Sequence, residues 1–308
     1  MNPLNPRHEK IIHDTARQLS RSDELTNICP SQWQGEPLPS HSAVKEIITL
    51  CRALIFPGFF GDSTVTRANI TYNAGLWTER LYTLLREQIH AGLSMGECDG
   101  AVAPDSAARH LAAADKAAAF IESLPRLREL LNDDVTATYH GDPAAVSKQE
   151  IIYCYPGLRA ISAYRIANCL YHLGVPIIPR MISEMSHSET GVDIHPAATI
   201  GRSFTIDHGT GIVVGATAII GDNVKIYQGV TLGARSFDLD EKGNPVKGVP
   251  RHPIIGNNVV IYSNATILGR ITIGDNAVIG GNIWVTTDVA PGERIIQAKA
   301  NNVLRLRN

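Results

Sequence analysis

Residues capable of proton transfer and of anion binding lie close together in the second half of this 308-residue chain. Asp193 and His208 are fifteen residues apart, and Asp207 directly precedes His208. Arg251 and His252 form a later pair. An imidazole can take up a proton during a reaction, a carboxylate can orient it, and a guanidinium can pair with a carboxylate. What these residues do together depends on the elements that position them.

An aliphatic residue recurs at almost every sixth position around these polar residues. The first series is Ile194, Ile200, Ile206, Ile212, Ala218, Val224 and Val230, and the second is Ile255, Ile261, Ile267, Ile273, Ile279 and Val285. A period of six fits neither a helix nor a strand and is typical of a parallel β-helix. We expect one inward side chain per hexad, about 18 residues per triangular coil and a little over four coils. Asp193 and His208 would then lie on neighbouring coils, close enough for contact.

The polar segment between the two series is too long to form one face of a coil. It predicts an excursion loop at about 234–252, and Arg251 and His252 lie where this loop returns. Before residue 191 the apolar spacing is helical, as in 43–56, 76–93 and 158–174, with Gly174 as a C-cap. We therefore predict a helical N-terminal domain at 1–190 and a β-helix domain at 191–308.

Five motifs resemble serine O-acetyltransferase over residues 141–289: GDPAA, YRIAN, DIHPAA, DHGTGIVVG and RHP. The resemblance implies an α + β fold, in which a helical N-terminal domain precedes a left-handed parallel β-helix of hexapeptide repeats. It also implies acetyl transfer from acetyl-CoA to the L-serine hydroxyl, giving O-acetylserine for cysteine biosynthesis. Acetyl-CoA would be a co-substrate, with no metal and no acyl-enzyme intermediate.

The resemblance also assigns roles to the acid–base residues. His208 matches the family's catalytic base, and Asp193 matches the carboxylate that orients it. Asp142 and Asp207 match the residues that bind the substrate amino group. Arg251 matches the group that binds the serine carboxylate.

The remaining matches lie near the oxyanion and the CoA side of the site. His252 would sit near the substrate or the developing oxyanion. Gly233, Ala234 and Ser263 are the candidate CoA-binding residues. Ala234 stands where the family usually has a second glycine, and Tyr262 begins a segment that is usually a run of small residues.

Composition and termini complete the expectations. With 28 basic and 30 acidic residues, we expect neither a nucleic-acid partner nor a membrane surface. Five cysteines without CxxC spacing, a polar N-terminus and no long apolar run predict a cytoplasmic protein. The resemblance implies a homotrimer or a dimer of trimers. Family members that dock into cysteine synthase end in Ile, whereas this chain ends in Asn308, so we do not expect that docking.

Three other interpretations remain open. The first is a hexapeptide acyltransferase that acts on homoserine or a sugar. The second is a β-helix zinc enzyme using His195, His208 and His252, although closely spaced histidine motifs are missing. The third is a scaffold without catalytic activity.

If Asp142, Asp207 and Arg251 bind the amino acid backbone, cysteine should compete with serine.

Overall fold

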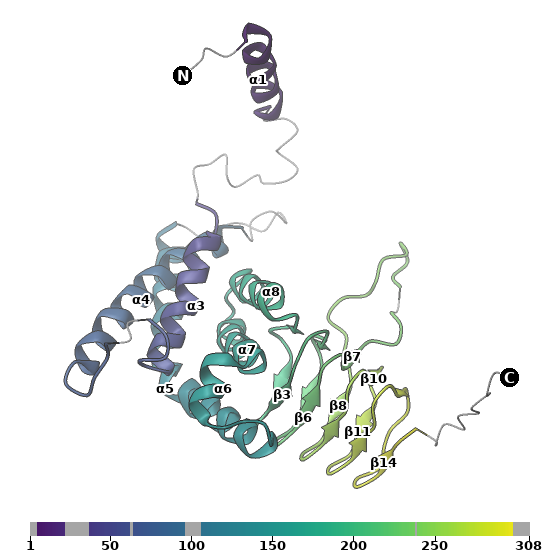
Figure 1. Ribbon diagram of the computed structural model, residues 1–308. Coiled ribbons are helices and arrows are strands. Elements are labelled where there is room, and N and C mark those ends of the chain that lie inside the picture. Colours follow the sequence, from purple (N-terminus) through teal and green to yellow (C-terminus); the bar gives the residue numbers. More distant parts are fainter. Residues whose placement is uncertain (1–4, 22–36, 62–63, 96–105, 238, 298–308) are drawn as a thin grey trace, which may run out of the picture.

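The computed structural model describes residues 5–21, 37–61, 64–95, 106–237 and 239–297. The helices of residues 41–190 gather at one end and a stack of short strands forms the other (Figure 1). The fold is α + β, with helices preceding a parallel β-helix, as the sequence predicts. The predictions at Cys29, Cys98 and Asn308 lie outside the described residues.

The helical part begins with α1 and ends next to the first coil. Its helices are α1 (Pro6–Leu19), α3 (His41–Ile55), α4 (Ile70–Met95), α5 (Ser106–Gly141), α6 (Lys148–Cys154), α7 (Pro156–His172) and α8 (Ile178–Thr190). Gly174 follows α7 with φ of +68°, and its N–H donates to the carbonyl of Tyr171. Gly174 thus belongs to the C-terminal cap of α7, where a left-handed residue favours glycine.

The β-helix consists of two- and three-residue strands. They are β1 (Asp193–Ile194), β2 (Thr199–Ile200), β3 (Thr205–Asp207), β4 (Val213–Val214), β5 (Ile219–Ile220), β6 (Lys225–Tyr227), β7 (Thr231–Gly233), β8 (Ile254–Ile255), β9 (Val260–Ile261), β10 (Thr266–Leu268), β11 (Thr272–Ile273), β12 (Val278–Ile279), β13 (Trp284–Val285) and β14 (Arg294–Ile295). Each strand from β1 to β10 pairs in parallel with the third strand after it, and β12 pairs with β14, which gives the sheets β1-β4-β7-β10-β13, β2-β5-β8-β11 and β3-β6-β9-β12-β14. The chain therefore winds around a three-sided prism.

The prediction of one inward residue per hexad was wrong. Most hexads bury a large residue within the strand and a second residue two positions earlier, as Ile220 and Ala218 show. Alternate residues of an extended chain point to the same side, so the position before the strand also faces the interior. The residues of the first predicted series are buried along the first coils. Up to Ile206 they lie within their strands, whereas Ile212 lies two positions before the buried strand residue Val214.

That change of phase marks a wider corner between β3 and β4. Partner residues of the first coil are 20 apart, as Asp193 and Val213 are. The next coil has the usual spacing of 18, from Val213 to Thr231. The extra two residues fall in the segment that contains His208, and the expected regular coil of 18 residues was therefore wrong at this place.

A second interruption lies between β7 and β8. The paired residues Thr231 and Thr266 are 35 apart, although they lie on adjacent strands. The intervening chain leaves the prism after β7 and projects beyond it (Figure 1). Arg251 and His252 lie where it returns, directly before β8.

A buried ion pair joins the helices to the first coil. Asp134 of α5 accepts hydrogen bonds from Arg165 of α7 at 2.6 and 2.8 Å, and both side chains are at most 4% exposed. Asp134 also accepts from the N–H of Phe204, and Arg165 donates to the carbonyl of Gly201. The YRIAN motif thus contributes an arginine that fixes the helices on the β-helix.

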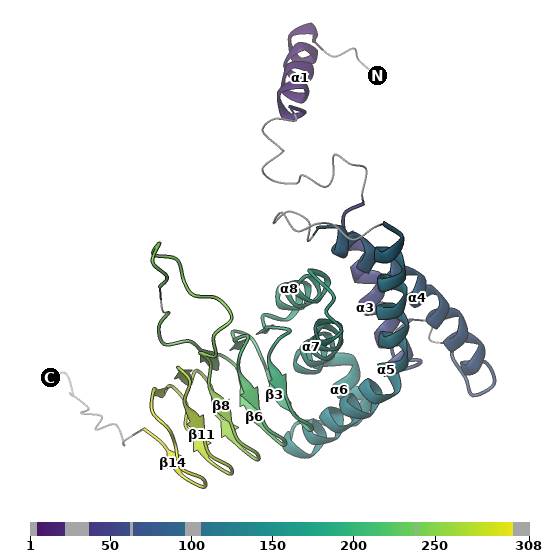
Figure 2. The same cartoon turned by 180° about the vertical axis from the view of Figure 1, so that it is seen from behind.

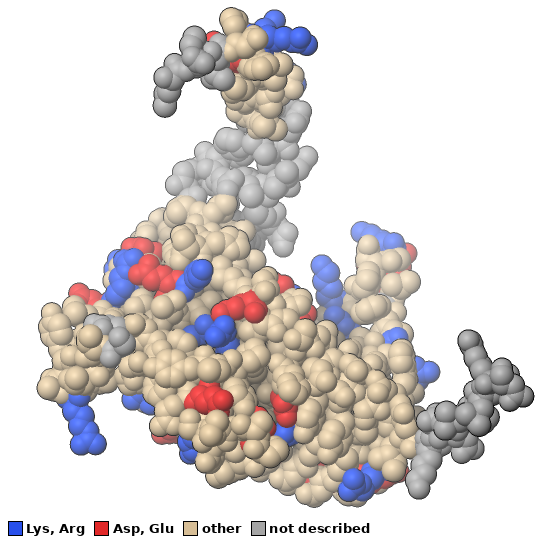
Figure 3. Space-filling model, viewed as in Figure 1, with Lys and Arg blue, Asp and Glu red and all other residues tan. Residues whose placement is uncertain are grey.

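Both ribbon views place α7 and α8 between α3 and the first strands (Figure 2). Gly157 near the start of α7 makes this contact close, because a Cβ there would lie 2.4 Å from the carbonyl oxygen of Ile206. On the face that Figure 3 presents, acidic and basic side chains are interspersed over the helical part. Among the described helices, none has the length and apolarity to cross a membrane.

Candidate active site

His208 lies in the wide corner after β3, and its side chain is 74% exposed. Its φ of +58° is a left-handed conformation, which costs energy for a residue other than glycine. Gly209 follows with φ of +100°, and a Cβ there would come within 3.0 Å of Ile206 and Val192 side-chain atoms. The corner thus turns the imidazole outward while glycine packs against the core.

Two carboxylates predicted to bind the substrate lie beside His208. Asp207 Oδ1 is 3.6 Å from Nε2 of His208. Asp142, in the loop after α5, accepts from the Tyr155 hydroxyl at 2.7 Å and from the Ala144 N–H at 2.8 Å. The Tyr155 hydrogen bond is the main cause that holds the pKa of Asp142 below its usual range, and the charge of nearby His208 adds to it. The structure therefore brings Asp142, Asp207 and His208 together.

Lys225 joins this group, although the sequence analysis missed it. Its Nζ lies 3.0 Å from Asp207 Oδ2 and donates to the carbonyl of Gly141 at 2.8 Å. The alignment of Ile206 with Ile226 across β3 and β6 puts Lys225 on the same outer face as Asp207. A regular period of 18 residues would not predict that alignment, because two extra residues lie between these strands.

Asp193 lies on β1, next to the wide corner but without a bond to His208. The Gly211 N–H donates to the carbonyl of Gly191, and the Asp193 N–H donates to the carbonyl of Ile212. The two segments are thus adjacent. Between these two described side chains, however, there is no hydrogen bond or ion pair, and His208 pairs with Asp207 instead. The two extra residues of the first coil lie in the corner that holds His208, whose side chain is 74% exposed.

His252 belongs to a second group of polar residues, built around Thr217 between β4 and β5. Its Nδ1 accepts from the Thr217 N–H at 3.1 Å and lies 2.8 Å from the Thr217 hydroxyl. Burial is the main cause that lowers the pKa of His252 to about 4, and the charge of Arg251 adds to it. At neutral pH the ring is therefore uncharged, and with Nδ1 accepting, the proton is on Nε2.

Arg251 adjoins His252 and has an unpaired donor. Its backbone N–H donates to the Thr217 hydroxyl at 2.9 Å, and its guanidinium lies 5.5 Å from the centre of the Phe237 ring. Its Nε is buried and has no hydrogen-bond partner among the described residues. An unpaired buried donor of this kind favours an anionic ligand, since a carboxylate would satisfy it.

The two groups occupy different corners of the prism. His208 follows β3, at the corner between the sheet that contains β3 and the sheet that contains β4. Arg251 and His252 lie at the corner between β4 and β5, where His252 bonds to Thr217. One face of the prism, formed by β1, β4 and β7, separates these corners. A single chain therefore does not bring all the predicted substrate-binding residues to one place.

Comparison with known proteins decides the family. A family model described as bacterial transferase hexapeptide (six repeats) matches residues 252–282. A serine acetyltransferase of Synechococcus elongatus is 47% identical over 267 residues, covering 86% of this chain and 84% of that protein. The chain belongs to the serine acetyltransferase family.

Solved structures agree with this assignment. Serine acetyltransferase isoform 3 of Entamoeba histolytica, in complex with cysteine, matches with a TM-score of 0.70 and 35% identity, covering 85% of this chain and 84% of that one. The soybean serine acetyltransferase complexed with serine matches with a TM-score of 0.52 and 29% identity, over 83% of this chain and 96% of that one. Membership of the family makes this chain an acyltransferase of the hexapeptide-repeat class.

The candidate CoA residues of this family member are also divided between the corners. Gly233 and Ala234 lie at the end of β7, at the corner of Arg251, whereas Ser263 follows β9 at the corner of His208. Tyr262 is 42% exposed, and its ring stacks on that of Tyr227 with a centroid distance of 5.1 Å. Tyr262 thus forms part of an aromatic surface next to the His208 group.

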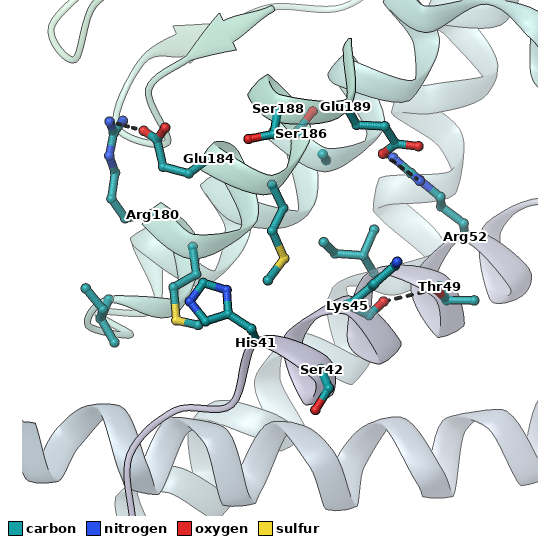
Figure 4. Close-up of a pocket in the computed structure, with 15 residues that line it drawn as sticks. His41, Ser42, Lys45, Thr49, Arg52, Arg180, Glu184, Ser186, Ser188 and Glu189 are labelled. Atoms are coloured by element: carbon teal, nitrogen blue, oxygen red, sulfur yellow. Dashed lines mark hydrogen bonds and ion pairs between the residues drawn. The ribbon is translucent and has the colours of Figure 1, made fainter. Parts of the chain in front are cut away.

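A cavity of about 940 Å³ lies elsewhere, between α3 and α8 (Figure 4). None of the predicted site residues lines it. Four of its charged side chains form ion pairs, Arg180 with Glu184 and Arg52 with Glu189. The family's chemistry must therefore be sought at the corners of the prism and not in this cavity.

The three histidines of the zinc alternative are likewise divided. His195 and His252 lie near the same corner, and the charge of His195 is one of the smaller causes, after burial, that lower the pKa of His252. His208 lies at the other corner. Within one chain these imidazoles do not surround a common point, as a three-histidine zinc site requires.

Proposed function

We propose that this protein transfers the acetyl group of acetyl-CoA to the hydroxyl of L-serine, giving O-acetylserine and CoA. The observation that carries the proposal is the exposed imidazole of His208 beside the carboxylates of Asp142 and Asp207, in a chain of the serine acetyltransferase family. A basic imidazole next to a site for an ammonium group suits a substrate that carries a hydroxyl close to its amino group.

His208 acts as the general base. It removes the proton from the serine hydroxyl as the oxygen attacks the thioester carbon of acetyl-CoA. The tetrahedral intermediate then collapses, the carbon–sulfur bond breaks, and the imidazolium returns the proton to the CoA thiolate. Asp193 orients and stabilises the imidazolium. This requires the largely exposed His208 side chain to turn from Asp207 toward the adjacent β1.

The two groups of polar residues bind opposite ends of serine. Asp142 and Asp207 hold the ammonium group, and Arg251 pairs with the carboxylate through a guanidinium whose Nε is otherwise unpaired. The Nε2–H of His252 donates a hydrogen bond to the developing oxyanion. The pKa of about 4 keeps the ring neutral at neutral pH, with its single proton on Nε2 in the position of a hydrogen-bond donor.

The site is assembled between subunits of a homotrimer, or of a dimer of trimers. The reason is geometric, since the corner of His208 and the corner of Arg251 lie apart on one chain. In a ring of identical subunits, one corner of each prism faces a different corner of its neighbour. Acetyl-CoA lies in the same cleft, where Gly233 and Ala234 come from one subunit and Ser263 from the other.

The chain has two functional domains under this proposal, residues 1–190 and 191–308. The β-helix supplies the base and the acyl-donor cleft. The helical domain supports oligomerisation and completes the acceptor site, because Asp142 follows the last residue of α5.

The test is CoA release from acetyl-CoA with L-serine, L-homoserine, an amino sugar or no acceptor. We expect release with L-serine to exceed that with the other acceptors. Homoserine is the closest competitor, because one methylene changes binding by only about 1–3 kcal/mol. Preference for homoserine or the sugar would replace the acceptor, and release with none of them would contradict the proposal.

A further inference from the structure

Lys225 bridges two parts of the proposed acceptor site that come from different domains. Its Nζ lies 3.0 Å from Asp207 Oδ2 on β3 and 2.8 Å from the carbonyl oxygen of Gly141 at the end of α5. The side chain of Lys225 is 15% exposed and that of Asp207 is 16% exposed. The ammonium group also lies 4.6 Å from the centre of the Tyr227 ring.

These contacts fix the orientation of the Asp207 carboxylate, including the direction of Oδ1. Oδ2 is occupied by Lys225, whereas Oδ1 is directed to His208 at 3.6 Å. The bond to Gly141 holds the residue before Asp142 at the same place. One side chain thus connects both proposed amino-group ligands, one directly and the other through its backbone neighbour.

Charge balance gives Lys225 a second effect. Two carboxylates in one site disfavour each other's ionisation, and a nearby positive charge counters this. The charge of Lys225 is among the causes that lower the pKa of Asp142, after its hydrogen bonds with Tyr155 and Ala144. With Asp142 and Asp207 ionised and Lys225 protonated, these three groups carry one net negative charge, which a single ammonium group neutralises.

We propose that Lys225 is a positioning residue for the acceptor amino group, holding Asp207 and the Gly141–Asp142 segment in their binding arrangement. This inference rests on the proposed function. Lys225 acts through the carboxylates and does not itself contact the reacting atoms. Its removal should therefore weaken serine binding more than it slows the chemical step.

The test compares steady-state kinetics of the full-length wild type and Lys225→Met. Methionine keeps much of the apolar stem and removes the ammonium group. We expect KM for serine to rise about tenfold, at the lower end of what losing a hydrogen bond to a charged group costs. We expect kcat and KM for acetyl-CoA to change little, and Lys225→Arg to restore part of the serine affinity.

Lys148→Met is the matched control. Lys148 opens α6 near the same loop, but its Nζ donates to the Thr136 hydroxyl at 2.8 Å and it is exposed. Its KM for serine should equal that of the wild type. Calorimetric titration of serine into each variant without acetyl-CoA gives a second measure of affinity that does not depend on turnover.

The pH dependence of serine affinity adds a readout that a purely structural role would not change. The titratable groups around Lys225 are Asp142, Tyr155, Asp207, His208 and Tyr227. Without the ammonium group the carboxylate of Asp142 should bind a proton at a higher pH, because the charge of Lys225 is one of the causes that lower its pKa. As the pH is lowered, Lys225→Met should therefore lose its affinity for serine at a higher pH than the wild type does.

An unchanged or lower KM for serine in Lys225→Met would overturn this inference, but it would leave the proposed function intact if the wild type is active with serine. Equal losses toward both substrates, together with a lower melting temperature and no rescue by Lys225→Arg, would also overturn it, because Lys225 would then only hold the domains together. Absence of serine-dependent turnover in the wild type would instead overturn the proposed function, and the inference with it.

Discussion

At the scale of single residues, the site depends on neighbouring groups that set charge and direction. His252 is kept neutral by burial and by Arg251, and Asp142 is kept ionised chiefly by Tyr155. The motifs identify His208, Asp142 and Arg251 as candidates. Lys225, in contrast, belongs to none of the motifs, and only the pairing of β3 with β6 places it beside Asp207.

The lowered pKa of His252 predicts a pH dependence of stability. Its pKa is about 4 in the folded chain and about 6.5 when unperturbed. Between these values the unfolded chain binds a proton that the folded chain does not, so stability is lost as the pH falls from about 6.5 toward 4. Urea unfolding at fixed protein concentration should show a smaller loss over this range in His252→Asn.

His187→Asn provides the control, because His187 is an exposed histidine on α8. Its unfolding free energy should follow the wild-type pH dependence. If His252→Asn shows the same pH dependence as the wild type, the account of a buried neutral imidazole at position 252 is wrong.

At the scale of elements, the period of six predicts the β-helix because the inward position must be aliphatic on every face. The same pattern concealed the wide corner, since Ile212 keeps the count of six while it occupies a different position relative to its strand. The helical spacing predicted α3, α4 and α7. It could not reveal that Arg165 and Asp134 pair across two helices, because the pairing depends on tertiary packing.

The buried pair predicts a large effect at the junction of helices and β-helix. Asp134→Ala leaves Arg165 buried without its carboxylate and removes the acceptor of the Phe204 N–H. We expect a loss of about 3–5 kcal/mol in the free energy of unfolding, which urea unfolding would measure.

Glu46→Ala is the matched control for this experiment. Glu46 pairs with Arg80 at 2.8 Å on the surface, where solvent screens the interaction, and its loss should cost far less. A similar small effect for both variants would mean that the Asp134–Arg165 pair does not secure the junction.

At the scale of the whole molecule, the separation of the two corners of one prism supports the proposal that a neighbouring copy completes the site. Individual site residues could be proposed from sequence motifs. Their distribution between corners could not, because it follows from strand order and from the points at which the wide corner and the long loop leave the prism.

Mixed oligomers test this arrangement. His208→Ala and Arg251→Ala chains, each inactive alone, should regain activity when they are refolded together in equal amounts. With random mixing in a ring, about one quarter of the sites receive an intact corner from each of two neighbouring chains. An assay of the mixed oligomers that finds no regained activity would show that each site is built from one chain.

The central claim is that His208 is the base in acetyl transfer to serine. The most direct measurement is serine-dependent CoA release from acetyl-CoA by the wild type, by His208→Ala and by the exposed-surface control His187→Ala. If His208 is the base, His187→Ala should release CoA at the wild-type rate, and release should fall about 10²–10⁴-fold in His208→Ala. Release by His208→Ala at the wild-type rate would contradict it.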